Sequence, residues 1–278
     1  MREEYALLKV GKESLLKVID EAEAAESVYN SNAIENSTLT LKETERILLE
    51  MELSRNVSVR EIFEAKNLAR VIDCERAGAG GDSLGEELIL FLHKMLMEGI
   101  DDSIAGRFRK KGEFVRVGYH IAPQPEHIKG MMDELLFKYS NDMDGYFLDK
   151  IAAFHLGFEN IHPFCDGNGR IGRVIMNFQF LELGFPRIII RNKEKQTYYL
   201  ALGEYDEDGQ TKTMERILAL ALLESLHKRI TYLKGEKIVR LSDYIKKRKL
   251  SAPLITNAAR RQTIPAFREK EVWKIGEG

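Results

Sequence analysis

The sequence predicts a mostly helical protein with one short β-hairpin and a small basic unit at the C-terminus. Only six prolines occur in 278 residues, and long stretches lack both proline and glycine, which favours helices because both residues disrupt helix interiors. Apolar residues make up 44% of the chain, so it can bury a sizeable core. This length fits one large domain with a small appendage.

Apolar periodicity predicts a series of helices in the first half of the chain. Their expected spans are 5–28, 40–53, 59–77, 84–97 and 128–138,. Thr40-Leu41-Lys42-Glu43 is a capping-box pattern, which indicates that the second helix opens there,. Residues 113–119 alternate as a strand would after the turn residue Gly112, so we expect a short hairpin,.

Two amphipathic helices flank residues 161–170. Apolar residues recur at helical spacing from Phe147 to Phe158 and again from Ile171 to Leu181,. Gly184 ends the second helix,. A further helix is expected over 215–233, followed by two short helices over 241–249 and 252–261 and a small β-wing over 264–275,.

Charge is distributed unevenly along the chain. The whole chain has a formal charge of -2, which gives no general reason to expect a polyanion or membrane partner,. Residues 228–278, however, hold fourteen Lys or Arg and five Asp or Glu. Because Gly235 follows a long helix at the start of this basic stretch, we expect a helical region over 1–100, a core over 101–233 and an appendage over 235–278.

Cysteine content and hydropathy exclude several classes of protein. Cys74 and Cys165 are the only cysteines, and neither has metal-type spacing around it, so a disulfide scaffold or zinc fold is not expected,. Acidic residues follow Met1 where a signal peptide needs an apolar run, and no stretch reaches the length of a membrane span,. The expected location is the cytoplasm, with no membrane partner.

One segment concentrates groups that can bind phosphate. It reads His162-Pro163-Phe164-Cys165-Asp166-Gly167-Asn168-Gly169-Arg170 and is followed by Arg173. Gly167 and Gly169 allow backbone N–H groups to point at an anion, and the positive end of the following helix also favours negative charge. Arg170 and Arg173, three residues apart on one helical face, can grip terminal phosphates.

The same segment offers a metal ligand and a base. Mg²⁺ prefers a carboxylate together with phosphate oxygens, which makes Asp166 the natural ligand. A neutral imidazole at His162 can remove a proton from an incoming hydroxyl. Taken singly, each residue is also typical of a polar turn or helix cap. A turn or a helix cap does not require two arginines next to a Gly-Asn-Gly nest. The combination of these residues therefore favours a phosphate site.

This segment matches the signature of the Fic family, His-Pro-Phe-x-Asp/Glu-Gly-Asn-Gly-Arg-x-x-Arg, at every specified position,. Similarity continues through Val115-Arg116-Val117-Gly118, Gly184-Phe185-Pro186 and Tyr198-Tyr199 and covers about residues 106–223. The resemblance implies an all-α Fic fold with a short β-hairpin flap, plus a small C-terminal domain that resembles a winged helix or helix-turn-helix.

The resemblance also implies Mg²⁺-dependent transfer of AMP from ATP to a Ser, Thr or Tyr hydroxyl of a target protein and of the chain itself. His162 would be the general base and Asp166 the magnesium ligand. The remaining expected site residues hold the nucleotide or dock the target. They are Gly167, Asn168 and Gly169 at the α-phosphate, Arg170 and Arg173 at the β- and γ-phosphates, Tyr199 at the adenine, and Phe114, Val115, Arg116 and Val117 in the flap.

Upstream, Ser31-Asn32-Ala33-Ile34-Glu35-Asn36 fits the inhibitory pattern of the Fic class with an N-terminal inhibitory helix. A Glu35 carboxylate paired with Arg173 would occupy the guanidinium that the γ-phosphate needs, and Ser31 would face the same group. The alternative is an ordinary helix end capped by Asn36. A second alternative keeps the same site but removes AMP from a modified target, with Glu35 positioning water.

The basic appendage gives the rival class of function. Its cationic residues can bind DNA phosphates, which would make the protein a DNA-binding regulator. These residues are Lys246, Lys247, Arg248, Lys249, Arg260 and Arg261. The other interpretation is a basic helical lid docked on the acidic body. A second copy of the chain is a further possible partner, as in a homodimer.

Overall fold

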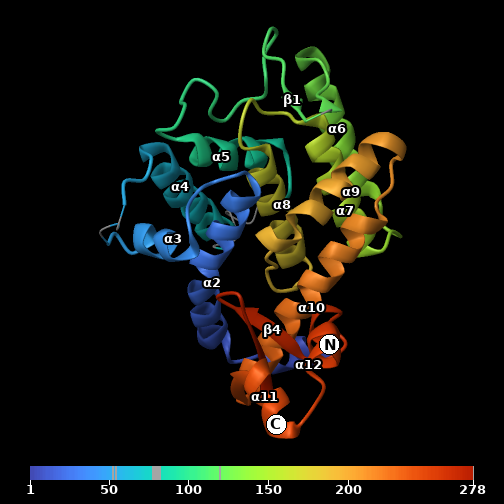
Figure 1. Cartoon of the computed structure of the whole chain (residues 1–278). Coiled ribbons are helices and arrows are strands. Elements are labelled where there is room, and N and C mark those ends of the chain that lie inside the picture. The colour runs from blue at the N-terminus through green and yellow to red at the C-terminus, as the bar shows by residue number, and fades with distance from the viewer. Residues whose placement is uncertain (52, 54, 77–82, 119, 278) are drawn as a thin grey trace.

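The computed structural model describes residues 1–51, 53, 55–76, 83–118 and 120–277. The predicted class is confirmed, because helices dominate and the strands form two small antiparallel sheets (Figure 1). The α-helices are α1 (Arg2–Leu8), α2 (Glu13–Ile34), α3 (Leu41–Leu48), α4 (Val59–Arg76), α5 (Glu86–Met97), α6 (Pro125–Asn141), α7 (Phe147–Ile161), α8 (Asn168–Glu182), α9 (Lys195–Asp208), α10 (Lys212–Lys234), α11 (Leu241–Arg248) and α12 (Ala252–Arg260). None of these helices is both long and apolar enough to cross a membrane.

Several boundaries differ from the expectation. The helix expected over 5–28 is divided, because Gly11 takes a left-handed φ of 72° between α1 and α2,. The capping box at Thr40 is present, but α3 ends at Leu48, and Glu50 beyond it has a φ of 56°. The end of α4 expected at Ala77 lies outside the described residues. Helix α9, preceded by the short 3₁₀ turn η2 (Asn192–Glu194), was not predicted.

The expected hairpin is present but lies slightly further along the chain. Strand β1 (Arg116–Val117) pairs with β2 (His120–Ile121), with Arg116 opposite Ile121 and Val117 opposite His120. Gly118 makes the turn with a φ of 60°, and Tyr119 lies outside the described residues. Residues 113–119 therefore include the turn as well as one strand.

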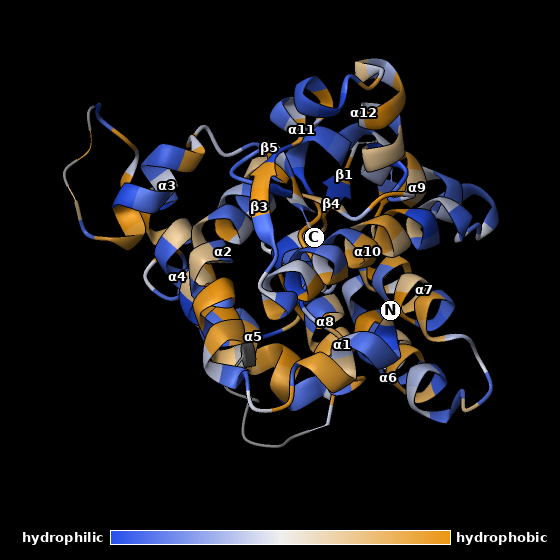
Figure 2. Ribbon diagram, turned by 90° about the horizontal axis from the view of Figure 1, so that it is seen from below, coloured by the Kyte–Doolittle hydropathy of each residue, from blue (hydrophilic) through white to orange (hydrophobic). Residues whose placement is uncertain are grey.

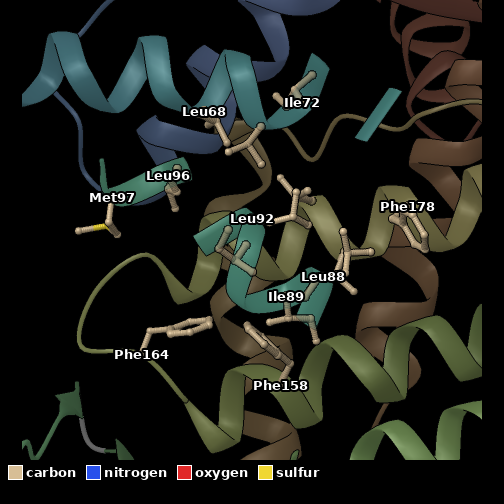
Figure 3. Packing of buried hydrophobic residues seen from close by; sticks show 14 of the residues in the cluster. Leu68, Ile72, Leu88, Ile89, Leu92, Leu96, Met97, Phe158, Phe164 and Phe178 are labelled. Carbon is tan, nitrogen blue, oxygen red and sulfur yellow. The ribbon is translucent and has the colours of Figure 1, made fainter. Parts of the chain in front are cut away.

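Two apolar clusters meet along α7 and α8, and Figure 3 shows part of the first. One joins these helices to α4 and α5 through buried residues such as Leu68, Leu92 and Phe158. The other joins them to α9 and α10 through residues such as Phe180 and Leu218. Figure 2 shows α5 coloured as hydrophobic along most of its length, as expected of a helix packed against α4 and α8. The loop between α7 and α8 therefore starts from two well-packed helices.

The C-terminal unit has its own small core. Strands β3 (Lys237–Arg240), β4 (Ala266–Glu269) and β5 (Val272–Glu277) form a sheet in the order β3-β5-β4. Buried side chains from α11, α12 and the sheet pack together beneath it, including Leu241 and Ile275. The two short helices and the hairpin match the sequence expectation, whereas β3 was not predicted. This unit lies at the opposite end of the molecule from β1 (Figure 1).

Buried ion pairs attach this unit to the body. Arg268 of β4 contacts Glu224 of α10 at 2.6 Å, and Glu224 also contacts Arg191 at 2.9 Å. Arg191 in turn pairs with Glu26 of α2. A neighbouring set consists of Lys228 with Glu23 at 3.0 Å and with Glu269 at 3.1 Å. The C-terminal unit is therefore connected by charge to both α10 and α2.

Candidate active site

Phe164 fixes the loop between α7 and α8. Its fully buried ring stacks on His93 of α5, with centroids 3.7 Å apart and planes 4° apart, and it lies beside Phe158 (Figure 3). The Gly106 N–H donates to His93 Nδ1 at 3.0 Å, so His93 Nε2–H donates to the Asp166 carbonyl at 3.1 Å,. Burial lowers the pKa of His93 to about 4, which keeps the imidazole neutral. His93, to which sequence analysis assigned no role, therefore positions the loop.

Asn168 closes the same loop from within. Its side-chain amide donates to the Phe164 carbonyl at 2.9 Å, and its side-chain oxygen accepts from the Phe164 N–H at 2.9 Å. Gly167, with a φ of 83°, precedes it and opens α8. The positive end of α8 is thus held against the loop, where it favours an anion.

His162 stands at the end of α7 in a left-handed conformation, with φ 49° and ψ 61°. Its Nδ1 lies 3.3 Å from the Glu159 carbonyl. With Nδ1–H as the donor, Nε2 is left as a proton acceptor. Burial, assisted by the charge of Arg109, lowers the pKa of His162 to about 4. The imidazole is therefore neutral at physiological pH, as a general base must be.

Asp166 lies between two guanidinium groups. Its Oδ1 accepts from Arg170 at 3.0 Å and from the Gly167 N–H at 2.6 Å, and its Oδ2 pairs with Arg60 of α4. Burial raises the pKa of Asp166, but the two arginines outweigh burial and the net shift is downward, so the carboxylate is ionised. Glu64 of α4 contacts Arg170 at 3.2 Å and Arg60 at 3.1 Å. Arg60 and Glu64 were missed by sequence analysis, although their spacing of four residues is a helical ion-pair signal.

The structure brings the predicted inhibitory residues to Arg173. The Arg173 Nη2 donates to Glu35 Oε1 at 2.8 Å and to the Ser31 carbonyl at 2.8 Å, and Nε donates to Ser31 Oγ at 3.0 Å. The side chain of Arg173 is 6% exposed and that of Glu35 is 36% exposed. Segments 138 residues apart thus meet in a largely buried ion pair.

Gly169 makes room for this contact. A Cβ placed there would lie 2.1 Å from Glu35 Oε1 and 3.0 Å from Arg173 Nη1. A side chain at this position would therefore exclude the carboxylate. Gly169 therefore serves the close approach of Glu35, whereas Gly167 makes the turn at the start of α8,.

A second carboxyl, Glu159, lies beside this pair. Its Oε1 is buried and has no hydrogen-bond partner among the described residues. Burial, together with the negative charge of Glu35, raises the pKa of Glu159 to about 8, so it is mainly protonated at neutral pH. Tyr198 of α9 completes this side of the site, with its hydroxyl 2.6 Å from His155 Nε2 and 3.4 Å from Arg173 Nη1.

Tyr199 and the hairpin form the edge of the site. The Tyr199 hydroxyl donates to the Ile34 carbonyl at 3.0 Å, which joins α9 to the end of α2. Phe114 is exposed, as are Arg116 and Val117. His120 of β2 contacts Asp206 of α9 at 2.8 Å and the Asn160 carbonyl of α7 at 2.8 Å, so β2 is attached to two helices.

The donor set at the loop fits magnesium bound mainly through a nucleotide. No group of three or more His, Cys, Asp or Glu that could hold a metal occurs among the residues that the structure describes. Asp166 is nevertheless an ionised, one-third exposed carboxylate at the positive end of α8. One carboxylate with phosphate oxygens and water is the environment that Mg²⁺ commonly takes in nucleotide-binding sites.

Comparison with known proteins finds a family match that includes the loop between α7 and α8. Residues 83–180 match the model of the Fic/DOC family. The chain is 30% identical over 181 residues to protein adenylyltransferase fic-1 of Caenorhabditis elegans, covering 63% of this chain and 35% of that protein. It is 29% identical over 224 residues to protein adenylyltransferase Fic of Nematostella vectensis, covering 78% and 51%. The chain thus spans about a third to a half of these relatives.

Solved structures show the same fold. A Fic domain containing signaling protein from Bacteroides thetaiotaomicron aligns with a TM-score of 0.74 and 26% identity, over 84% of this chain and 96% of that one. A Fic family protein from Desulfovibrio desulfuricans aligns with a TM-score of 0.67 and 23% identity over 99% and 94%. The fold and the loop define a helical protein built around the Gly-Asn-Gly turn that opens α8. More particularly, the chain carries a Fic domain.

Proposed function

We propose that this protein transfers AMP from ATP to a Ser, Thr or Tyr hydroxyl of a target protein, and to itself, and that Glu35 restrains this activity. The observation that carries the proposal is that Glu35 and Ser31, at the end of α2, hold Arg173, the second arginine of the motif. Relatives named protein adenylyltransferase support the class of reaction.

In this proposal, His162 performs the proton transfer. Its neutral Nε2 accepts the proton of the attacking hydroxyl, a role worth about 10²- to 10⁴-fold in rate. The hydroxyl oxygen bonds to the α-phosphorus while the bond between the α- and β-phosphates breaks, and pyrophosphate leaves. The backbone at Gly167 and Gly169 and the positive end of α8 stabilise the α-phosphate as its charge changes. Asn168 holds the loop through Phe164. Asp166 would hold Mg²⁺, which neutralises phosphate charge.

The arginines bind the far end of the nucleotide. Arg170 is oriented by Asp166 and Glu64 toward the terminal phosphates, and Arg173 completes the grip when Glu35 leaves it. While Glu35 is in place, Arg173 has a carboxylate where the γ-phosphate would lie. Tyr199 lines the adenine side and touches Ile34, and residues Phe114–Val117 would dock the target segment through backbone hydrogen bonds.

The first prediction tests this function directly. Removing the carboxylate with Glu35→Gly should raise AMP transfer by about 5-fold or more, since the ion pair is worth at least the ~1 kcal/mol of a good exposed pair. The measurement is the initial rate of protein labelling by ATP labelled on the α-phosphate, with magnesium. Glu50→Gly is the matched control, because it removes an exposed carboxylate outside the site.

Two further variants make the test selective. Glu35→Gly combined with His162→Ala should lose labelling yet keep nucleotide affinity by calorimetry. Glu35→Gly combined with Arg173→Ala should be as poor as Arg173→Ala alone. Equal rates for the wild-type protein and Glu35→Gly would mean that the end of α2 is not a brake.

Removal of AMP is the second candidate, favoured by the position of Glu35. Its side chain is one-third exposed at the edge of the site, where the carboxylate can orient a water molecule. Incubating the AMP-modified protein with wild-type enzyme and with Glu35→Gly distinguishes the two activities. Release of AMP only when Glu35 is present would assign it to water positioning.

A further inference from the structure

Four charged side chains form a closed ring of ion pairs, and the predicted metal ligand Asp166 is one of them. Arg170 joins Asp166 Oδ1 to Glu64, at 3.0 Å and 3.2 Å. Arg60 joins the same Glu64 oxygen, at 3.1 Å, to Asp166 Oδ2. Both carboxylate oxygens of Asp166 thus contact guanidinium groups, and two members of the ring come from α4, outside residues 83–180.

The two arginines of the ring differ in their freedom to move. The side chain of Arg170 is 4% exposed, whereas that of Arg60 is 58% exposed. Arg60 contacts Asp166 only through a terminal nitrogen, while its Nε is bonded to Glu64. A rotation near the end of the side chain can therefore release Asp166 and keep the bond to Glu64.

We propose that Arg60 is a positioning residue that holds the Asp166 carboxylate in place before nucleotide binds and yields Oδ2 to Mg²⁺ when the magnesium nucleotide arrives. This inference rests on the proposed function, which gives Asp166 its metal. A guanidinium and Mg²⁺ are both cations that seek the same oxygen, so they compete for it. Glu64 then balances the charge of the displaced Arg60.

The consequence is that displacing Arg60 from Asp166 reduces the binding free energy of the magnesium-bound nucleotide only. An exposed ion pair is worth about 0.2–1 kcal/mol, so competition by Arg60 should weaken binding of the magnesium nucleotide by about 1.5- to 5-fold. Binding of metal-free nucleotide leaves Asp166 with Arg60 and should not depend on this pair.

The experiment compares nucleotide affinity with and without the metal. Glu35→Gly serves as the parent, and calorimetry measures a non-hydrolysable ATP analogue in excess Mg²⁺ and in EDTA. Adding Arg60→Gln should tighten binding in Mg²⁺ by about 1.5- to 5-fold and leave the EDTA value unchanged. In turnover, KM for the magnesium nucleotide should fall while kcat stays constant. Arg60→Lys, which keeps the charge, should resemble the parent.

Arg70→Gln is the matched control. Arg70 lies on the same helix, is 56% exposed and pairs with Glu98 at 2.6 Å, so it reproduces the loss of an exposed α4 ion pair. Arg70→Gln should change nucleotide affinity neither in Mg²⁺ nor in EDTA. Equal or weaker binding of Arg60→Gln in Mg²⁺ would overturn the inference, and weaker binding in both buffers would make Arg60 a phosphate ligand.

The failure of this inference can be told from failure of the proposed function. If the parent transfers AMP but Arg60→Gln does not tighten magnesium-dependent binding, only the role of Arg60 is wrong. If the parent neither binds the magnesium nucleotide nor transfers AMP, the proposed function fails, and the inference fails with it.

Discussion

Glu159 is the residue whose environment differs most from what its side chain ordinarily requires. A carboxyl at this depth is commonly paired with a cation or satisfied by hydrogen bonds. The Oε1 of Glu159 instead has no hydrogen-bond partner in the part of the chain that the structure describes, and a Cβ added at Gly172 would lie 2.8 Å from it. The absence of a side chain at Gly172 therefore leaves room for Glu159, which stays neutral between the Glu35 pair and the His162 turn.

The second prediction concerns the pH dependence that Glu159 imposes on stability. Its pKa in the folded state is raised to about 8, so the native protein retains a proton that the unfolded chain loses above its normal pKa. Stability should therefore fall as pH rises from about 4.5 to 8. Glu159→Gln removes this slope, so the variant should be more stable than wild type at pH 8, by about 4 kcal/mol.

Urea unfolding at several pH values measures this difference. The advantage of Glu159→Gln should disappear below about pH 4.5, where Glu159 is protonated in both the folded and the unfolded chain. Glu182→Gln is a useful comparison, since burial also raises the pKa of Glu182 but this residue lies far along α8 from the loop. An advantage of Glu159→Gln that is constant with pH would mean that the carboxyl is ionised in the fold.

The conformation of the loop between α7 and α8 depends on a few hydrogen bonds from the Asn168 side chain. The third prediction is that Asn168→Ala lowers the free energy of unfolding by about 1–3 kcal/mol, because it leaves the buried N–H and carbonyl of Phe164 unpaired,. Nucleotide affinity should fall too, as the anion-binding turn loosens. Thermal unfolding and calorimetry report the two effects.

Asn141→Ala provides the control for that variant. Asn141 is exposed, and its side-chain amide bonds the Phe137 carbonyl near the end of α6. Its removal should change stability by only a few tenths of a kcal/mol. Similar losses for both variants would contradict a special role of Asn168 in the loop.

Sequence patterns predicted elements well where local signals are strong. The capping box at Thr40 and the periodic helices around the motif are present, because local hydrogen bonds and apolar spacing specify them,. Helix α9 was missed because tyrosines, Gly203 and acidic residues interrupt its apolar stripe. Its position depends on packing against α7 and α10, which a local pattern does not contain.

The residues of the candidate site also fall into those that the sequence predicted and those that it did not. The motif residues are contiguous, so their gathering followed from the sequence, and the pairing of Glu35 with Arg173 followed from the resemblance. The remaining contacts come from side chains that ordinary helices carry in great number: His93, Arg60, Glu64 and Glu159. Only the packing of α4, α5 and α7 around the loop distinguishes them.

At the scale of the whole molecule, charge attaches the C-terminal unit to the body. The fourth prediction is that Arg268→Ala lowers stability by about 3 kcal/mol, since Glu224 is left in a buried position with one partner fewer,. Lys247→Ala removes an exposed pair with Glu277 instead and should have little effect,. Denaturant unfolding of both variants measures the difference between their free energies of unfolding. Equal losses of stability would contradict the role of burial.

DNA binding by this unit stays a prediction. Some of its cations are engaged within the protein: Lys247 pairs with Glu277, and the Arg248 guanidinium lies over the Tyr244 ring. Binding through Lys246–Lys249 and Arg260–Arg261 should weaken steeply with salt, because each neutralised phosphate releases counterions. A gel shift at low salt that shows no retention would leave the interpretation of a docked lid.

Two contacts of α2, one near its middle and one just past its C-terminal end, set a constraint on the stretch between them. Glu26 lies against Arg191 near the C-terminal unit, and nine residues later Glu35 lies against Arg173. One residue inserted between them would turn Glu35 by about 100° and move it by about 1.5 Å, enough to separate the second pair while the first stays bound. The number of residues between Glu26 and Glu35 therefore decides whether Arg191 and Arg173 can both be paired at the same time.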